Sequence, residues 1–274
     1  MANKIKDLID ALRVKPGDKV KLKAKDARGE GLFPDEQETR AATAALAEDI
    51  NALQDRLYAE RKRAVLVVLQ GMDTSGKDGT VRDVFNATGP IGIEVHAFGR
   101  PSELELAHDY LWRVHAVCPR RGMIGIFNRS HYEDVLVPKA HDLLPKSEIE
   151  KRYDHINDLE RMLTDNGTAV LKFMLHISAK KQAESLQERL DDPKKRWKFN
   201  PGDLEDRKRW DAFEDAYETM LEKCSTKAAP WYVIPADRKW VRNAAVGHVV
   251  KATLEEMDPQ YPAPAWKPSD FQVV

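Results

Sequence analysis

Short, unbroken apolar runs alternate with amphipathic stretches along most of the chain. The first run is AVLVVLQ at residues 64–70, bounded by charged residues and a glycine. Such runs are typical of strands in a parallel sheet, because helices cover both faces of the sheet and no strand position faces water. Four similar runs therefore predict further buried strands, at residues 91–98, 123–128, 169–177 and 231–235.

Helical patterns separate these runs. A long stretch of helix-forming residues precedes the first strand, at residues 35–63. Further helical patterns lie at residues 79–87, 103–117, 146–165, 179–191, 203–223 and 239–257. This alternation predicts an α/β fold of three layers, with a mainly parallel five-stranded sheet and helices on both faces.

The segments outside this pattern divide the chain further. Residues 1–34 form an N-terminal arm that begins with a short amphipathic helix, and residues 35–257 form the α/β domain. Within that domain, the polar and basic stretch at about 191–211 predicts a mobile lid that leads into a helix; Trp210 anchors the lid to the core, whereas Trp197 could anchor it or clamp a ligand. Residues 258–274 contain four prolines and predict an extended tail laid over the surface.

Composition narrows the classes of partner. The chain has 44 Lys and Arg residues against 45 Asp and Glu residues, so any anion site must arise from local clustering of charge. No apolar run reaches the roughly 20 residues of a membrane span, and the first residues lack the apolar core of a signal peptide. Cys118 and Cys224 have no metal-ligand spacing and are expected to be reduced. We expect a cytoplasmic protein with neither a nucleic-acid nor a membrane partner.

A glycine-rich turn carries the strongest chemical signal. Residues 71–77, GMDTSGK, follow the first apolar run directly and precede a helix. They match the G-x-x-x-x-G-K part of the Walker A phosphate-binding loop in the strand–turn–helix context that the pattern requires. Turn N–H groups, the positive helix end and the lysine charge all favour phosphate. The predicted phosphate-binding residues are Gly71, Thr74, Ser75, Gly76, Lys77, Asp78, Gly79 and Arg82.

The same loop departs from the pattern at the metal-binding position. Asp78 stands where Ser or Thr usually supplies a hydroxyl ligand for Mg²⁺. Thr80 is one possible substitute, but Asp73 is the better candidate because hard cations prefer carboxylate oxygen.

Polar residues also follow the third apolar run, as NRSHYED at residues 128–134. Ligands of open α/β sheets bind beyond the carboxyl ends of the strands. Asn128 occupies the place of a Walker B aspartate and can orient a metal-bound water, while Glu133 and Asp134 can supply the missing carboxylate. Arg129 would direct its guanidinium at phosphate oxygens. The predicted metal ligands are thus Asp73, Asn128 and Glu133, unless these residues merely cap the strand.

Together the motifs resemble the polyphosphate kinase 2 family. The resemblance is carried by residues 71–85, 98–115, 125–139 and 192–217, and extends over nearly the whole length. It implies a P-loop fold similar to thymidylate kinase, a Mg²⁺-dependent reaction, polyphosphate as phosphate donor or acceptor, and a homo-oligomer. Asn128 and the HYEDV sequence resemble the class that acts on both AMP and ADP.

The predicted reaction is the reversible transfer of the terminal phosphate of inorganic polyphosphate to AMP or ADP. Asp73, Lys77 and Arg129 are the predicted catalytic residues, joined by Arg189, which resembles the lid-side arginine of the family. A repeating anion needs a track of cations, so Lys180 and Lys181 are added to the phosphate-binding set. The predicted nucleotide-binding residues are Arg100, Asn128, Arg129 and Arg196.

Two other functions remain open from the sequence. The first is an ATP-dependent P-loop kinase for a nucleotide or small molecule, and the second is a non-enzymatic polyanion- or nucleic-acid-binding module. The sequence also leaves open the choice between AMP and ADP, the use of guanine nucleotides, and whether ATP is mainly product or substrate.

Overall fold

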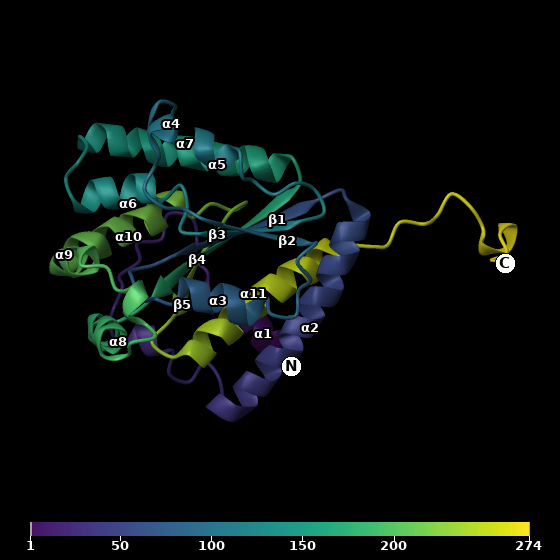
Figure 1. Cartoon of the computed structure of the whole chain (residues 1–274), viewed down its shortest axis with the longest axis horizontal. Coiled ribbons are helices and arrows are strands. Elements are labelled where there is room, and N and C mark those ends of the chain that lie inside the picture. The colour runs from purple at the N-terminus through teal and green to yellow at the C-terminus, as the bar shows by residue number, and fades with distance from the viewer. Residues whose placement is uncertain (1, 274) are drawn as a thin grey trace.

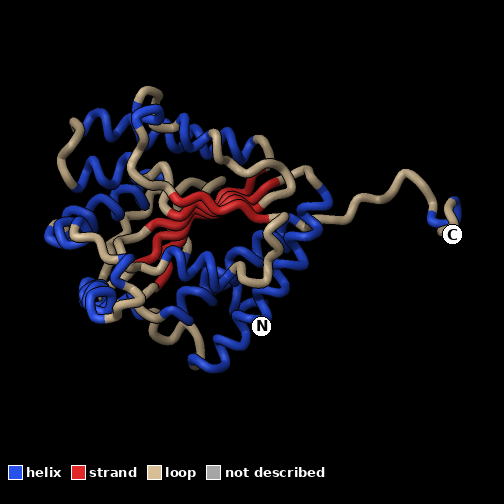
Figure 2. Tube along the Cα trace, in the orientation of Figure 1, coloured by secondary structure: helices blue, strands red, loops and turns tan. Residues whose placement is uncertain are grey.

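The five apolar runs form one sheet in the computed structural model, which describes residues 2–273 (Figures 1 and 2). The strands are β1 (Ala64–Gln70), β2 (Ile93–Ala97), β3 (Ile124–Asn128), β4 (Thr168–His176) and β5 (Trp231–Pro235). Their order is β2-β3-β1-β4-β5, and every neighbouring pair is parallel. The predicted parallel five-stranded sheet is confirmed, and it brings all five carboxyl ends to one edge.

Helices cover both faces of the sheet (Figure 1). One face carries α5 (Trp112–His115), α6 (Glu133–Ala140), α7 (Lys146–Asp165) and α10 (Trp210–Cys224), and the other carries α1 (Ala2–Leu12), α2 (Glu36–Glu60), α3 (Lys77–Val84) and α11 (Lys239–Met257). Side chains of β1 alternate between the two cores, with Leu66 and Val68 on the α7 side and Val65 and Val67 on the α11 side. The predicted three-layer architecture is confirmed.

Several predicted elements differ in extent. The pattern at 103–117 forms two short helices, α4 (Glu103–Leu106) and α5, and the pattern at 203–223 forms α9 (Gly202–Lys208) and α10, which part at Arg209. Helix α6 was not predicted, because Pro138 lies inside it and the apolar residues before Pro138 are consecutive, which obscures the helical period. Strand β2 was wrongly predicted to be buried: it lies at the sheet edge, where Val95 is 52% exposed.

The chain ends behave differently from each other. Helix α1 places Ile9 and Leu12 in the core on the α11 side, and Val14 N–H donates to the Trp231 carbonyl. The tail contacts α2 only at its start, where the Tyr261 hydroxyl donates to Asp55 Oδ2 at 2.6 Å. It then extends away from the body (Figure 1), so the expectation that it lies over the surface is wrong beyond this point, where Trp266, Phe271 and Val273 are exposed.

Two remaining features concern the expectations about a membrane span and about the two cysteines. Within residues 2–273, no helix combines the length and apolar character that crossing a membrane requires. Cys118 and Cys224 are both free thiols, as expected.

Candidate active site

The glycine-rich turn connects β1 to α3 through an unusual backbone path. Three of its residues have positive φ angles: Gly71 at 151°, Thr74 at 69° and Gly76 at 94°. A side chain at Gly71 would place its Cβ 2.6 Å from the Leu175 carbonyl oxygen, so only glycine fits there. The hydroxyls of Thr74 and Ser75 are buried, and neither has a hydrogen-bond partner among the described residues. A phosphate-sized ligand or water would satisfy such groups.

Lys77 begins α3 and points into this turn. Its side chain is buried, and Nζ donates to the Gly71 carbonyl oxygen at 2.7 Å. Burial and, next to it, the neighbouring charge of Arg129 lower the pKa of Lys77 to about 8, against the opposing effect of Asp73. An anion bound in the turn would therefore raise the pKa of Lys77 again and favour its charged form.

Arg129 joins the strand tip to the glycine-rich turn. It follows β3 in a left-handed conformation, with φ at 62°. Its Nη2 lies 2.6 Å from Asp73 Oδ1 and its Nη1 lies 3.1 Å from Glu133 Oε2. Burial opposes the charge, but Glu133 and Asp73 outweigh it and raise the pKa of Arg129. The guanidinium is thus a permanent cation held between two carboxylates.

A buried ionic network supports this strand tip from behind. Lys172 of β4 and Glu160 of α7 are almost fully buried and form an ion pair. The Tyr132 hydroxyl donates to Glu160 Oε1 at 2.8 Å, and His131 Nε2 lies 3.2 Å from the same oxygen. Burial opposes ionisation of Glu160, but Lys172 and His131 hold its pKa below the usual value. His131 and Tyr132, which follow Arg129 by two and three residues, are therefore held in place by the core. His131 is thus a packed residue.

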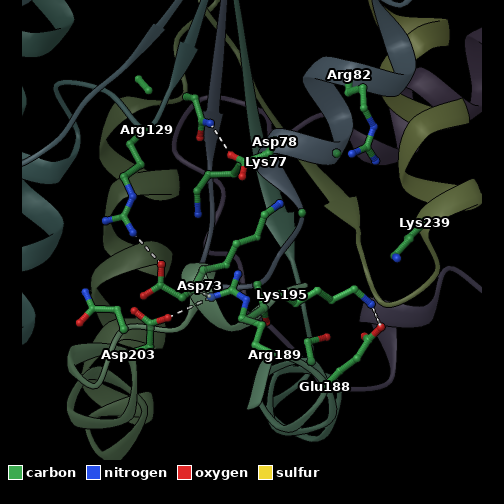
Figure 3. A pocket seen from close by; sticks show the side chains of 18 of the residues that line it. Asp73, Lys77, Asp78, Arg82, Arg129, Glu188, Arg189, Lys195, Asp203 and Lys239 are labelled. Carbon is green, nitrogen blue, oxygen red and sulfur yellow. Dashed lines mark hydrogen bonds and ion pairs between the residues drawn. The ribbon is translucent and has the colours of Figure 1, made fainter. Parts of the chain in front are cut away.

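The glycine-rich turn, Lys77 and Arg129 line a cavity of about 590 Å³ beyond the carboxyl ends of the strands (Figure 3). It lies between α3, the start of α11, α8 (Ala179–Asp191) and the lid segment, which contains η2 (Arg196–Lys198) and α9. Its size is that of a ligand site. Ten of the predicted site residues line it: Asp73, Thr74, Gly76, Lys77, Asp78, Gly79, Arg82, Asn128, Arg129 and Arg189.

Other predicted residues do not line this cavity. Arg100 and Lys180 are exposed to solvent, Lys181 forms an ion pair within its own helix at 3.1 Å, and Arg196 Nε donates to the Leu190 carbonyl oxygen at 2.9 Å. Their roles in binding phosphate or nucleotide remain predictions.

The remaining predicted residues lie around the turn itself. Gly71 and Glu133 line a small neighbouring pocket that also reaches Asp73, and Ser75 is buried beneath the turn. Thr80, the possible substitute for the missing hydroxyl ligand, is buried and donates to the Gly76 carbonyl oxygen at 3.1 Å. Its hydroxyl is directed into its own helix, so Asp73 is the better-placed oxygen donor.

The lid segment supplies a second ion pair to the cavity. Arg189 Nη1 lies 3.1 Å from Asp203 Oδ2, and Figure 3 shows this pair beside Asp73. Burial raises the pKa of Asp203 to about 6, and the nearby charge of Asp73 adds to the effect. Trp197 borders the cavity and is 78% exposed, whereas Trp210 packs against the core as predicted.

Sequence reasoning missed five charged residues of the cavity wall. They are Asp83, Glu188, Asp203, Lys239 and Arg242. Asp203 stands in the first turn of α9, where an acidic residue is ordinary helix chemistry, and α11 carries no recognisable motif. The one available signal for α11 was the i, i+3 spacing of Lys239 and Arg242, which places both on the same helix face.

Comparison with known proteins identifies the family. The family model for polyphosphate kinase 2 (PPK2) matches residues 34–262. The chain belongs to this family. An AMP/ADP-polyphosphate phosphotransferase of Meiothermus ruber is 52% identical over 253 residues, which cover 92% of this chain and 95% of the relative. An ADP-polyphosphate phosphotransferase of Rhodopseudomonas palustris is 38% identical over 262 residues, 91% of each chain.

A solved structure agrees with this membership of the polyphosphate kinase 2 family. The crystal structure of polyphosphate kinase 2 from Arthrobacter aurescens TC1 superposes with a TM-score of 0.91 at 38% identity. The match covers 96% of this chain and 94% of that one. The fold is therefore that of the family.

Proposed function

We propose that the protein transfers the terminal phosphate of inorganic polyphosphate to AMP or ADP, reversibly and with Mg²⁺. The observation that carries this proposal is the charge of the cavity at the glycine-rich turn. Eight Lys and Arg side chains and five Asp and Glu side chains line it, whereas the whole chain has a net charge of −1. Local clustering thus provides the positive field that a polyanionic substrate needs.

The arrangement suits phosphoryl transfer, which requires positioning and dispersed positive charge and little covalent participation by the protein. Lys77 and the N–H groups of the turn would hold the phosphates at the reacting junction. Arg129 and Arg189 would stabilise charge on the transferred group from two sides. Each arginine pairs with a carboxylate, Asp73 or Asp203, so phosphate oxygens would take over these contacts on binding.

The oxygen donors of the site fit Mg²⁺. Among residues 2–273, no cluster of three or more His, Cys, Asp or Glu side chains could hold a metal ion by itself. Mg²⁺ commonly binds through one or two carboxylates, with waters and substrate phosphates completing the octahedron. Asp73 would hold it, assisted by Asn128, whose Nδ2 donates to Asp78 Oδ1 at 2.6 Å and leaves its own oxygen available. When bound, the ion would neutralise phosphate charge at the junction.

The relatives support both AMP and ADP as acceptors, since the Meiothermus protein is named for both nucleotides and the Rhodopseudomonas protein for ADP. We keep Arg100, Asn128 and Arg196 as the nucleotide-binding candidates and ATP as a product or reverse-direction substrate. A homo-oligomer and a cytoplasmic location also remain proposals.

A direct assay tests the function. The protein is incubated with Mg²⁺, long-chain polyphosphate and either AMP or ADP, without ATP, and the formation of ADP and ATP is measured. Absence of product, with activity appearing only when ATP is the donor, would favour an ordinary P-loop kinase.

Two variants test the site. We expect Asp73→Ala and Lys77→Ala each to lower turnover by at least ~10²-fold, as loss of a single charge-stabilising group commonly does. Lys208→Ala is the matched control, because Lys208 is exposed on α9 and its one ion pair among the described residues is with Glu205. Near-normal turnover in both site variants would remove the assignment.

A further inference from the structure

The tip of the glycine-rich turn is a tight turn with an unfavourable residue at its centre. The Met72 carbonyl oxygen accepts a hydrogen bond from Ser75 N–H at 3.1 Å, which closes a β-turn around Asp73 and Thr74. Thr74 has a φ of 69°, a conformation that β-branched residues rarely adopt. A positive φ at this third position is typical of a type II turn, which differs from type I mainly in the orientation of its central peptide group. The observed orientation of that group therefore depends on contacts from outside the turn.

Gln182 of α8 supplies such a contact. Its side chain is only 1% exposed, and Nε2 donates to the main-chain carbonyl oxygen of Asp73 at 3.3 Å. The peptide group is planar and trans, so the Thr74 N–H points the opposite way, away from Gln182. Thr74 lines the cavity, whereas Gln182 is buried and does not. The contact thus keeps the carbonyl oxygen out of the anion site and directs the N–H toward it.

Arg207 of α9 fixes which way the Gln182 amide points. Its Nη1 donates to Gln182 Oε1 at 2.9 Å and to the Ala179 carbonyl oxygen at 2.8 Å. A guanidinium has donors and no acceptor, so the amide oxygen must face Arg207. The amide nitrogen then faces the carbonyl oxygen of Asp73, and the chemistry of the two partners sets this orientation.

The start of α8 is anchored to the end of a strand. The N–H and Oγ of Ser178, which caps α8, donate to the two carboxylate oxygens of Asp237, each at 2.8 Å, just beyond β5. The backbone of Gln182 is therefore fixed relative to the strand ends, while its amide is held from the lid segment. A displacement of α9 would reach the tip of the turn through two successive hydrogen bonds, from Arg207 to Gln182 and from Gln182 to Asp73.

We propose that Gln182 is a positioning residue, which Arg207 of the lid segment orients. It holds the peptide group between Asp73 and Thr74 so that the Thr74 N–H faces the phosphate of the substrate. Without it, rotation of this peptide group would turn the Asp73 carbonyl oxygen toward the anion and repel it. The identity of that anion rests on the proposed function, whereas the control of the turn by Gln182 is tested without any substrate.

Hydrogen–deuterium exchange of the ligand-free protein tests the control of the turn. Gln182→Met keeps the volume of the side chain and removes both polar atoms. We expect the amides of residues 71–77 to exchange several-fold faster in this variant, because the contact that orders the turn is lost, and those of β1 and α10 to be unchanged. Gln187→Met is the matched control, because Gln187 is exposed on the same helix and donates to Asp191 at 2.8 Å.

Turnover of polyphosphate with ADP tests the role of the Thr74 N–H. We expect Gln182→Met to lower kcat/KM by at least ~10-fold, because a donor to the phosphate is misdirected. In a Thr74→Gly background the same substitution should cost only about twofold, because glycine adopts a positive φ without strain. If Gln182 merely packed the lid segment against α8, its replacement would cost the same in both backgrounds. Arg207→Met should show a smaller loss in the same direction.

The outcomes separate this inference from the proposed function. If the wild type turns over no polyphosphate while exchange in residues 71–77 rises as expected, the proposed function falls and the control of the turn stands. If the wild type is active and Gln182→Met matches it in exchange and in turnover, only the positioning role is overturned. An equal loss in both Thr74 backgrounds overturns it as well.

A second variant decides if Gln182→Met is unfolded. Arg207 is only partly buried, so Arg207→Met is the milder change. Faster exchange in residues 71–77 of that variant supports the relay from the lid segment to the turn. Exchange equal to that of the wild type overturns it.

Discussion

The affinity of the site for polyphosphate should depend on pH through Lys77. The pKa of this lysine is lowered to about 8, first by burial and then by the charge of Arg129. At pH 7 about nine tenths of the ammonium groups are charged, and at pH 9 only about one tenth, from the ordinary titration relation. If the bound state requires the charge, raising the pH from 7 to 9 weakens binding by about tenfold.

The reference for this measurement is Lys77→Arg, whose side chain stays charged throughout the range. Long-chain polyphosphate is a suitable ligand, because its internal phosphates are fully ionised at both pH values. We expect the ratio of the dissociation constants at pH 9 and pH 7 to be about tenfold larger in the wild type than in Lys77→Arg. Calorimetry in buffers of different ionisation enthalpy should also show uptake of close to one proton per site at pH 9.

The same shift affects the stability of the ligand-free protein. The folded-state pKa of about 8 lies below the ordinary value of 10.5, so the unfolded chain binds more protons between these values. Stability attributable to Lys77 therefore rises with pH from about 8 to 10.5 and is lost as the pH falls through 8.

Equal pH dependence of binding in the wild type and Lys77→Arg, with no proton uptake, would refute the assignment of Lys77 as a buried, titrating phosphate ligand.

Two further predictions concern the ionic pairs around the site. Lys172→Met should lower the free energy of unfolding, measured in urea, by about 3–5 kcal/mol, because it leaves the Glu160 carboxylate buried without a cation. Adding Glu160→Gln should recover part of this loss. A larger loss in the double variant than in Lys172→Met would contradict this account. Asp203→Asn should free Arg189 and lower the KM for polyphosphate several-fold at pH 7. Since the pKa of Asp203 is about 6, lowering the pH from 7 to 5 should lower the KM for polyphosphate to a similar extent in the wild type but not in Asp203→Asn. Parallel pH profiles of KM in the two proteins would argue against this role of Asp203.

The sequence alone determined the local features of this protein. Unbroken apolar runs located five strands, because a strand buried on both faces leaves no room for polar positions. The strand–turn–helix context around Gly71 and Lys77 located the phosphate-binding turn, because the turn N–H groups, the positive helix end and the lysine charge all favour phosphate. Asp73 followed from its place in the turn and from the preference of hard cations for carboxylate oxygen, and Arg129 from the rule that ligands bind beyond the carboxyl ends of parallel strands.

Only the tertiary structure decided which charges meet. Nothing near Arg242 in the chain indicates that it reaches the turn at Gly76, since more than 160 residues separate them. The exposure of β2 likewise depends on its place at the sheet edge, whereas its composition resembles that of the buried strands. Residue patterns indicate how much of a segment is buried and which conformations its backbone can adopt. The partner of a charged side chain depends on long-range packing, which brings α11, the lid segment and two strand tips to one cavity.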